Sequence, residues 1–521
     1  MVALHMDRDS KDTRFVYVST LVFFVLTLFN ILHHEMWRDE FEFWMRARDA
    51  NSLLDLIKNM RYTGHPMLWS LILYPITGVT RNPLAMQMAH LLVATFSAFI
   101  FLRFAPFNKL LRGLFIFGYF PFFEYATISR NYAVGILFLF IFCAYFGKDF
   151  KKRSYILLSV ILFLMCQCNA FSAILAIALG IAIFLEPALL KNFTVYRSGR
   201  FYASILIFTA GLAISIIQMI PPADSVFYHP NTTARIILIG IAASISHLWD
   251  AFIPIPRIEP TFWNTNILTY LPVQRDMISA LSLIASLGLF LCSLCIVVRK
   301  KIPAVYYILG VVGVTAFCSI FYEGFLRHKA HYYFAFVTAM WIGSYYPTKE
   351  FEIPSVDRFF GFFEKNKSYF MTVVFSIGVV SASIANTLDY IYPFSASKEA
   401  ADYIKQNNLQ NMAIAGHVDY AAEAVSGYLD KPLYYPAENR IGSFELWTNN
   451  RRNMNVAKAL EVIRHFSDTV KDDVLLVLND PPPHFKIRQY GLVPVKSFPT
   501  CTVRDECFFL YVMKYERKGI Q

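Results

Sequence analysis

The sequence predicts an α-helical polytopic membrane protein with about 11 transmembrane helices and a C-terminal extracytoplasmic α/β domain. Of its 521 residues, 56% are hydrophobic and only 16% are charged, and the mean hydropathy is +0.43. A soluble protein of this length is far less apolar. Apolar runs of about 17 to 25 residues, each able to cross about 30 Å of hydrocarbon as a helix, recur along the first three quarters of the chain. The remaining C-terminal part loses this character and indicates a soluble domain.

The predicted spans begin with a retained helix. Arg8, Lys11 and Arg14 precede the first apolar run, and no small-residue cleavage site follows it, which predicts a helix that starts in the cytoplasm. The spans are expected at residues 15–32, 84–104, 114–128, 132–146, 155–168, 170–185, 201–220, 277–298, 305–322, 332–346 and 369–392.

Two shorter apolar segments are ambiguous. If residues 67–79 lie along the surface, about 20 basic residues fall in short cytoplasmic segments and roughly 12 in longer external ones, as the positive-inside rule requires. We therefore expect residues 67–79 to continue the first external loop. Residues 236–253 are interrupted by His247 and Asp250 and are expected to lie on, or dip into, the outer face.

This topology divides the chain into two parts. Residues 1–394 form the transmembrane domain, with external loops at 35–82 and 221–276, and residues 395–521 form the external domain. In the latter, period-two and helical patterns predict a small layered α/β domain. Its strands are expected at 412–415, 432–435, 474–478, 493–495 and 508–512, and its helices at 398–406, 420–427 and 456–466.

Charge and cysteine placement limit the partners. The net charge of +11 comes from basic residues in short loops between spans, so it follows membrane topology and gives no reason to expect nucleic-acid binding. Six of the 8 cysteines lie in apolar runs, where a thiol behaves as a small hydrophobe. Cys501 and Cys507 are either free thiols or a local disulfide, and the external placement of their domain favours the disulfide.

Charged residues gather at the external ends of the spans. They are Asp39 with Glu40, His65, Glu124 with Arg130, and Arg327 with His328. Each has an ordinary interpretation as a surface ion pair, an interfacial anchor or a turn residue, but their position on one face favours a common site. His33, His34, Glu35 and Asp39 also raise the possibility of a divalent metal. They lack a recognised ligand spacing, so a structural role is favoured and a metal is not required.

The first external loop carries a motif of a known family. Asp39-Glu40 follows the first span, Ala47-Arg48 comes next, and His65-Pro66 precedes Leu68-Trp69, with Arg130 and Tyr132 further on. Over roughly residues 15–150 this resembles the C-type glycosyltransferase (GT-C) superfamily, in particular the protein O-mannosyltransferase and aminoarabinose transferase groups. His65 departs from relatives that place lysine there, and histidine is only partly charged near neutral pH.

The resemblance implies a GT-C-like fold and a reaction. Such enzymes move a sugar from a polyprenyl-phosphate-linked donor to a hydroxyl of a glycan, lipid or protein acceptor outside the cytoplasm, with inversion at the anomeric carbon. That chemistry needs a carboxylate base and cations for the leaving phosphate. The implied base is Asp39 with Glu40 beside it, and the implied donor-binding residues are His65, Arg130, Glu124, Arg327, His328, Arg48 and Tyr62.

We expect Asp39, His65, Arg130 and Arg327 to surround one external cavity. The alternative is a non-catalytic protein that binds or translocates a lipid phosphate, although a transporter typically places polar residues at mid-membrane and shows internal duplication. The resemblance and the compact loops favour a bacterial cytoplasmic membrane. The sequon Asn231-Thr232-Thr233 has meaning only in a eukaryotic host.

Overall fold

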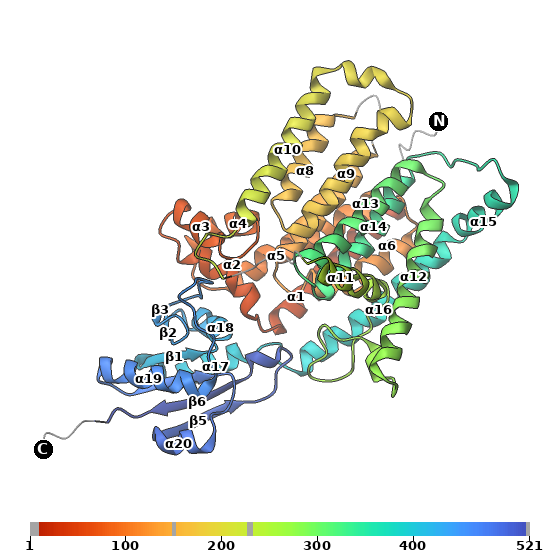
Figure 1. Cartoon of the computed structure of the whole chain (residues 1–521). Coiled ribbons are helices and arrows are strands. Elements are labelled where there is room, and N and C mark those ends of the chain that lie inside the picture. The colour runs from red at the N-terminus through yellow and green to blue at the C-terminus, as the bar shows by residue number, and fades with distance from the viewer. Residues whose placement is uncertain (1–9, 148–152, 227–232, 517–521) are drawn as a thin grey trace, which may run out of the picture.

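The computed structural model of the chain describes residues 10–147, 153–226 and 233–516 (Figure 1). The start of the sequon, Asn231 and Thr232, and the basic residues Arg8, Lys148, Lys151 and Lys152 lie outside this range. The membrane part contains α1 (Ser10–His33), α2 (Arg38–Arg48), α3 (Leu53–Met60), α4 (Leu68–Thr77), α5 (Leu84–Phe104), α6 (Lys109–Ile116), α7 (Tyr132–Phe146), α8 (Tyr155–Cys166), α9 (Ala170–Leu189), α10 (Gly199–Met219), α11 (Ala234–Ser246), α12 (Arg275–Val297), α13 (Lys301–Ile320), α14 (Leu326–Gly343), α15 (Pro354–Lys365) and α16 (Lys367–Ile391).

The chain is an integral, multi-pass membrane protein. Within the described residues, 8 helices are long and apolar enough to cross a membrane: α1, α5, α9, α10, the stretch Ala234–Ala251, α12, α13 and α16. All but Ala234–Ala251 coincide with predicted spans. That stretch was expected on the outer face; by length and composition it qualifies as a span, although a 3₁₀ turn at Leu248–Ala251 replaces its last α-helical turn.

The prediction of 11 spans is not confirmed, because four of the expected segments take other forms. Tyr132–Phe146 and Tyr155–Cys166 are apolar helices of only 15 and 12 residues. The third segment, residues 332–346, is part of α14, which begins at Leu326 and carries charged residues in its first turn. A helix rises 1.5 Å per residue, so the two short helices reach about 18 to 23 Å, which is less than the hydrocarbon thickness.

The predicted span at residues 114–128 is wrong. Helix α6 ends at Ile116, and a π-helical turn occupies Tyr119–Glu124. Gly118 lies at the break, where an added Cβ would be 3.1 Å from the carbonyl oxygen of Phe115. Pro121 inside the turn has no backbone N–H to donate, which disfavours a regular α-helix through this segment.

The loop after α1, which the charge distribution predicts to be external, folds into three short helices, α2, α3 and α4. Helix α4 has 10 residues and contains Pro75, so it spans about 15 Å, roughly half the hydrocarbon thickness. This agrees with the prediction that residues 67–79 continue the loop. Trp44, Trp69 and Met60 are fully or almost fully buried in a small core between these helices, which makes the loop a compact unit.

The C-terminal part is a three-layer α/β domain. Its sheet has the order β3-β2-β1-β4-β6-β5, with β1 parallel to β2 and β4 and the remaining pairs antiparallel. Helices α17 and α18 contribute apolar side chains to the core on one face of the sheet, and α19 to the core on the other. The elements are α17 (Ser397–Gln406), β1 (Ala413–His417), α18 (Asp419–Leu429), β2 (Leu433–Tyr435), β3 (Arg440–Gly442), α19 (Val456–Val470), β4 (Val474–Leu478), α20 (His484–Gln489), β5 (Leu492–Phe498) and β6 (Phe508–Met513).

All five predicted strands and all three predicted helices of this domain are present, with β3 and α20 in addition. A disulfide joins Cys501 to Cys507, as the external placement favoured. The domain packs on the first loop (Figure 1), where Gly427 of α18 faces Phe41 of α2 so closely that a Cβ would lie 2.2 Å from the Phe41 ring. Only glycine permits that contact.

Candidate active site

The site is built around the first turn of α2. Trp37 precedes the helix in an extended conformation, and its backbone N–H donates to the Glu40 carboxylate at 3.1 Å. Glu40 also accepts the Ser129 backbone N–H at 2.7 Å and lies 3.1 Å from His34 Nε2. Its side chain is completely buried. Glu40 therefore fixes the start of α2 and is not available to a substrate, in contrast to the role expected for it beside Asp39.

His34 extends this anchor to α16. Its Nδ1 lies 3.0 Å from the carboxylate of Asp389, so one imidazole bridges two buried acids. Burial alone would lower the pKa of His34, but Asp389 and Glu40 outweigh it and raise the pKa to about 10. His34 is thus a charged bridge at neutral pH. Together with Glu40, it has the structural role that was favoured over metal binding.

Asp39, the residue directly before Glu40 in α2, faces a pair of arginines from distant parts of the chain. Its Oδ2 forms an ion pair with Arg130 and accepts a hydrogen bond from Arg327 Nη2 at 3.2 Å. Arg38 Nε lies 3.8 Å from Oδ1, and 24% of the Asp39 side chain is exposed. Burial would raise the pKa of Asp39, but these three guanidinium groups together lower it. Asp39 is therefore an ionised carboxylate.

Aromatic rings hold the two arginines in place. The Arg327 guanidinium lies 5.3 Å from the ring centroid of Trp37 and 5.1 Å from that of Trp263. Arg130 lies 5.3 Å from the Phe43 ring and 5.7 Å from the Tyr132 ring. Stacking on aromatic faces suits a guanidinium and leaves its N–H edge free for an anion.

Both guanidinium groups retain unused donors. Nε and Nη1 of Arg327 and Nε of Arg130 are buried and make no hydrogen bond. A buried charged donor without a partner is costly, and such groups concentrate at sites that a ligand completes. A phosphate, with several acceptor oxygens, matches two converging guanidinium groups.

His65 lies in the same region but differs from the expected cation. Its ring packs 5.6 Å from the Phe43 ring, and its buried Nδ1 makes no hydrogen bond. Burial and the nearby charges of Arg130 and Arg327 lower the pKa of His65 to about 3, so it is neutral at physiological pH. It can donate or accept one hydrogen bond, but it supplies no permanent charge. Gly64, with φ of +67°, turns the chain just before it.

His328 orients Tyr132, whose ring contacts Arg130. Its Nδ1 accepts the Phe325 backbone N–H at 2.7 Å, which leaves Nε2 to donate to the Tyr132 hydroxyl, also at 2.7 Å. Both ring nitrogens are thereby engaged. His328 supports the site from behind, and the structure gives it no free nitrogen for a donor phosphate.

Of the other predicted residues, Glu124 supports the ring that contacts Arg327, whereas Tyr62 and Arg48 make contacts away from Asp39. Glu124 accepts the indole N–H of Trp263 at 3.0 Å and the Tyr119 hydroxyl at 3.3 Å, so it fixes the ring on which Arg327 stacks. Tyr62 donates to Asp224 at 2.9 Å on the exposed side of the loop. Arg48, at the far end of α2, binds Asp49 and Asp430 and docks the C-terminal domain.

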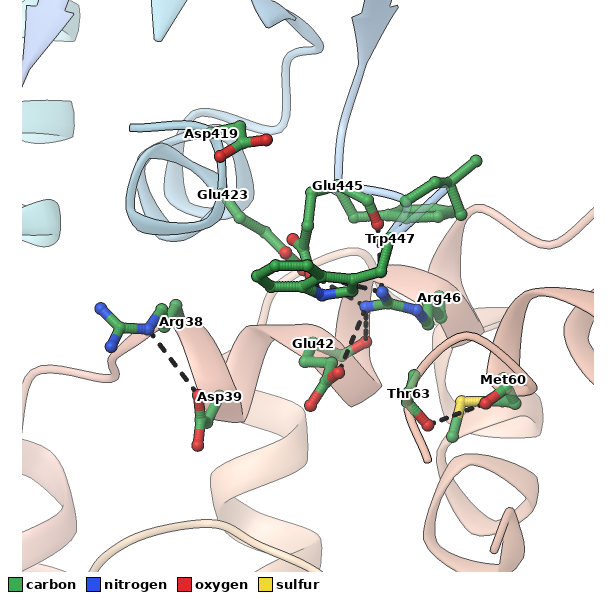
Figure 2. Close-up of polar contacts among 12 residues, drawn as sticks. Arg38, Asp39, Glu42, Arg46, Met60, Thr63, Asp419, Glu423, Glu445 and Trp447 are labelled. Carbon is green, nitrogen blue, oxygen red and sulfur yellow. Dashed lines mark hydrogen bonds and ion pairs between the residues drawn. The ribbon is translucent and has the colours of Figure 1, made fainter. Parts of the chain in front are cut away.

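Glu42, which is absent from the residues predicted from the sequence, lies near enough to Arg130 to feel its charge. Figure 2 shows Asp39 and Glu42 extending from the same side of α2, three residues apart. Its nearest cation is Arg46, at 3.9 Å. Burial, partly offset by Arg46 and Arg130, raises the pKa of Glu42 to about 7. The signal was its i, i+3 spacing from Asp39, which puts two acids on one helical face.

Arg46, one turn after Glu42 on the same face of α2, enters the C-terminal domain. It donates to the backbone oxygen of Glu445 at 3.1 Å and approaches Glu423 to 3.9 Å (Figure 2). Arg38 binds Asp505 at 2.7 Å and Glu506 at 3.2 Å, inside the loop that the disulfide closes. The soluble domain therefore holds both ends of the helix that carries Asp39. Among the described residues, no group of three or more His, Cys, Asp or Glu side chains is arranged to hold a metal ion.

No protein-family profile and no curated protein sequence matches this chain. Among solved structures, the chain is similar to the crystal structure of ArnT from Cupriavidus metallidurans bound to undecaprenyl phosphate. The sequence identity is 11% and the TM-score is 0.49, over 98% of this chain and 99% of that chain. The undecaprenyl phosphate belongs to that structure. The contacts among Asp39, Arg130 and Arg327 are those of the present chain.

Proposed function

We propose that this protein is a GT-C-type membrane glycosyltransferase that moves a sugar from a polyprenyl-phosphate-linked donor to an acceptor hydroxyl on the extracytoplasmic face. The observation that carries the proposal is the convergence of Arg130 and Arg327 on Asp39, with buried guanidinium donors left unpartnered. A carboxylate beside two phosphate-binding cations is the set of groups that this transfer requires.

The arginine pair would bind the phosphate of the donor. As the bond between the anomeric carbon and the phosphate oxygen breaks, negative charge grows on that oxygen, and two rigid guanidinium groups stabilise it. Trp37 and Trp263 restrain Arg327, and Phe43 and Tyr132 restrain Arg130. The polyprenyl phosphate leaves as the anion.

Asp39 would accept the proton of the acceptor hydroxyl. That oxygen forms its bond to the anomeric carbon from the face opposite the leaving phosphate, which inverts the configuration. The phosphate competes with Asp39 for the two arginines, and the carboxylate released from them becomes more basic. Glu40 has no part in this step because its oxygens are occupied by Trp37, Ser129 and His34.

The test compares D39N with E259Q in purified full-length protein. Glu259 is a carboxylate of another external segment, ion-paired with Arg257 at 3.0 Å. Sugar transfer from defined polyprenyl-phosphate sugars and donor binding are measured in parallel. We expect D39N to bind donor and to lose about 10² to 10⁴-fold in transfer rate, with E259Q unchanged.

Two results contradict the proposal in different ways. Transfer by D39N at the wild-type rate would show that Asp39 is not the base. Donor binding by the wild type, with no transfer to any glycan, lipid or protein acceptor across the donor panel, would support the non-catalytic lipid-phosphate-binding alternative.

A further inference from the structure

A cavity of about 250 Å³ lies at the end of the membrane helices remote from Asp39. It is enclosed by the connection between α5 and α6, the C-terminal ends of α12 and α14, and the N-terminal ends of α13 and α16. The helices that reach the Asp39 site do so with their other ends, for example α16 through Asp389 and α14 through Arg327. The charge distribution of the loops predicts that this remote end faces the cytoplasm.

The lining of the cavity is amphipathic. Apolar side chains such as Val297, Pro303, Met340 and Met371 form one part of its wall, and hydrogen-bonding groups form another. A volume of this size holds a small polar group together with a few methylene groups. The lining therefore suits an amphiphile better than a fully hydrated ion.

The polar part of the lining is positively charged. It contains Lys300 and Lys367, and its only acid is Glu364. Both oxygens of Glu364 are already engaged, one by Arg299 at 3.0 Å and the other by Thr348 at 2.7 Å. The lysines consequently face the cavity without a carboxylate that belongs to them.

The two lysines differ in how they are held. Lys300 Nζ donates to the Gly343 carbonyl at 2.6 Å, whereas Lys367 makes no hydrogen bond or ion pair within the described parts of the chain. Burial and the charge of Lys367 lower the pKa of Lys300, so the two ammonium groups are close enough to repel each other. An anion between them would remove that repulsion.

The N-terminal ends of helices add to the positive potential at the cavity. Helices α6, α13 and α16 begin at Lys109, Lys301 and Lys367, and the residues at these starts that line the cavity are Asn108, Lys300, Pro303, Lys367 and Ser368. The N-terminus of a helix carries partial positive charge and free N–H groups. The lysines and the helix ends thus favour an anion with acceptor oxygens.

We propose that this cavity binds the phosphate headgroup of an anionic lipid from the membrane leaflet on that side, with Lys300 and Lys367 contacting the phosphate. The parts of the acyl chains nearest the headgroup would lie against the apolar wall. Basic pockets between helices at this depth are suited to such headgroups. The site is independent of the proposed transferase reaction, since its residues share no contact with Asp39, Arg130 or Arg327.

The experiment uses the full-length protein, delipidated in detergent, and native mass spectrometry with phosphatidylglycerol and phosphatidylcholine of matched acyl chains. The test variant is K300Q/K367Q. The control is K301Q/K365Q, which removes the same charge from exposed neighbours that do not line the cavity. A further arm adds inorganic phosphate as a competitor of phosphatidylglycerol.

We expect the wild type and K301Q/K365Q to prefer phosphatidylglycerol over phosphatidylcholine by about tenfold or more, and K300Q/K367Q to lose that preference. Inorganic phosphate that fails to compete shows that the acyl chains contribute, as a lipid site requires. If inorganic phosphate does displace phosphatidylglycerol, and K300Q/K367Q still loses its preference, the two lysines bind a free anion and the lipid proposal is wrong. An unchanged preference in K300Q/K367Q, or an equal loss in K301Q/K365Q, would overturn the site.

Discussion

At the scale of single residues, the proposal depends most on Arg130 and Arg327. Each donates to Asp39 in the structure, and each keeps buried N–H groups without a partner. Two guanidinium groups stacked on Trp37, Trp263, Phe43 and Tyr132 cannot move far, so the ligand must bring its oxygens to them. This rigidity makes the loss of either one costly.

In the proposed reaction R327Q removes one of the two charges that stabilise the leaving phosphate, so we expect it to lower kcat/KM for the sugar donor by about 10² to 10³-fold. R327K should recover only part of the rate, since an ammonium group lacks the planar fork. The measurement is the initial rate of sugar transfer at several donor concentrations. R257Q, an external arginine paired with Glu259, is the control. A rate for R327Q equal to that of R257Q would remove Arg327 from the site.

Glu42 gives the site a pH dependence. It is neutral below its raised pKa of about 7 and charged above it, and the charge then lies beside Arg130 and Asp39. A second carboxylate competes with the donor phosphate for Arg130, so we expect the KM for the donor to rise about tenfold as pH passes from 6 to 8. E42Q should show a nearly constant KM over this range. The same rise in E42Q would assign the pH dependence to another group.

The sequence singled out Asp39, Arg130 and Arg327 because charged residues at the ends of apolar runs are energetically costly, and the structure brings the three together. The sequence could not separate Asp39 from Glu40, since adjacent helical residues point in different directions and only the fold shows that Glu40 meets His34 and Ser129. The sequence also could not predict that the pKa of His65 is lowered so far that the residue is neutral. The lowered pKa results from burial next to arginines that are distant in sequence.

At the scale of elements, His34 joins α16 to the start of α2. The bridge places one charged imidazole between the buried carboxylates of Asp389 and Glu40. We expect H34Q to lower the free energy of unfolding by about 3 to 5 kcal/mol, because two buried acids lose their counter-charge. H33Q is the matched control, since the adjacent His33 is exposed and bonds only to a backbone oxygen of its own helix.

The pH dependence of this bridge has a definite sign. The pKa of His34 is raised in the folded state from 6.5 to about 10, so its contribution is fully present below pH 6.5 and is lost as pH rises through about 10. The difference in unfolding temperature between wild type and H34Q should therefore shrink between pH 7 and pH 10. A difference that stays constant over that range would contradict a charged His34.

Local patterns predicted the C-terminal elements well because each strand and helix there carries its own period. Val474–Leu478, for instance, is an apolar run bounded by polar residues and forms β4 with those bounds. The segment at 114–128 failed for the opposite reason. Its hydropathy resembles a span, but Gly118 and Pro121 impose a break that an average over the window conceals.

At the scale of the whole molecule, the soluble domain and the first loop form one assembly. Arg38 binds Asp505 and Glu506, Arg46 reaches Glu445, and Arg48 reaches Asp430. The residues of each pair lie far apart in the sequence, so no local sequence pattern predicts that they pair. The sequence therefore could not predict how the C-terminal domain docks on the first loop. That contact depends on ion pairs between two units whose own elements can be predicted separately.

The disulfide loop lies at one end of this contact. Replacing both cysteines in C501S/C507S removes a short closed loop, which we expect to cost about 2 kcal/mol. It also releases Asp505 and Glu506 from a fixed position opposite Arg38. Transfer activity should fall, and limited proteolysis should cut between α16 and α17 faster. C292S/C295S, which removes two free cysteines of α12, is the control. Equal protease resistance in both variants would contradict a role of the loop in docking.

The position of this loop also links the hold on α2 to the redox state of two thiols. The carboxylates that bind Arg38 lie inside the ring that the disulfide closes, and disulfides form and persist in oxidising compartments. A freshly inserted chain would already contain every side chain of the site and still lack a firmly held α2. In the proposed function, the redox state of the surrounding compartment would thereby control how firmly the helix that carries Asp39 is held.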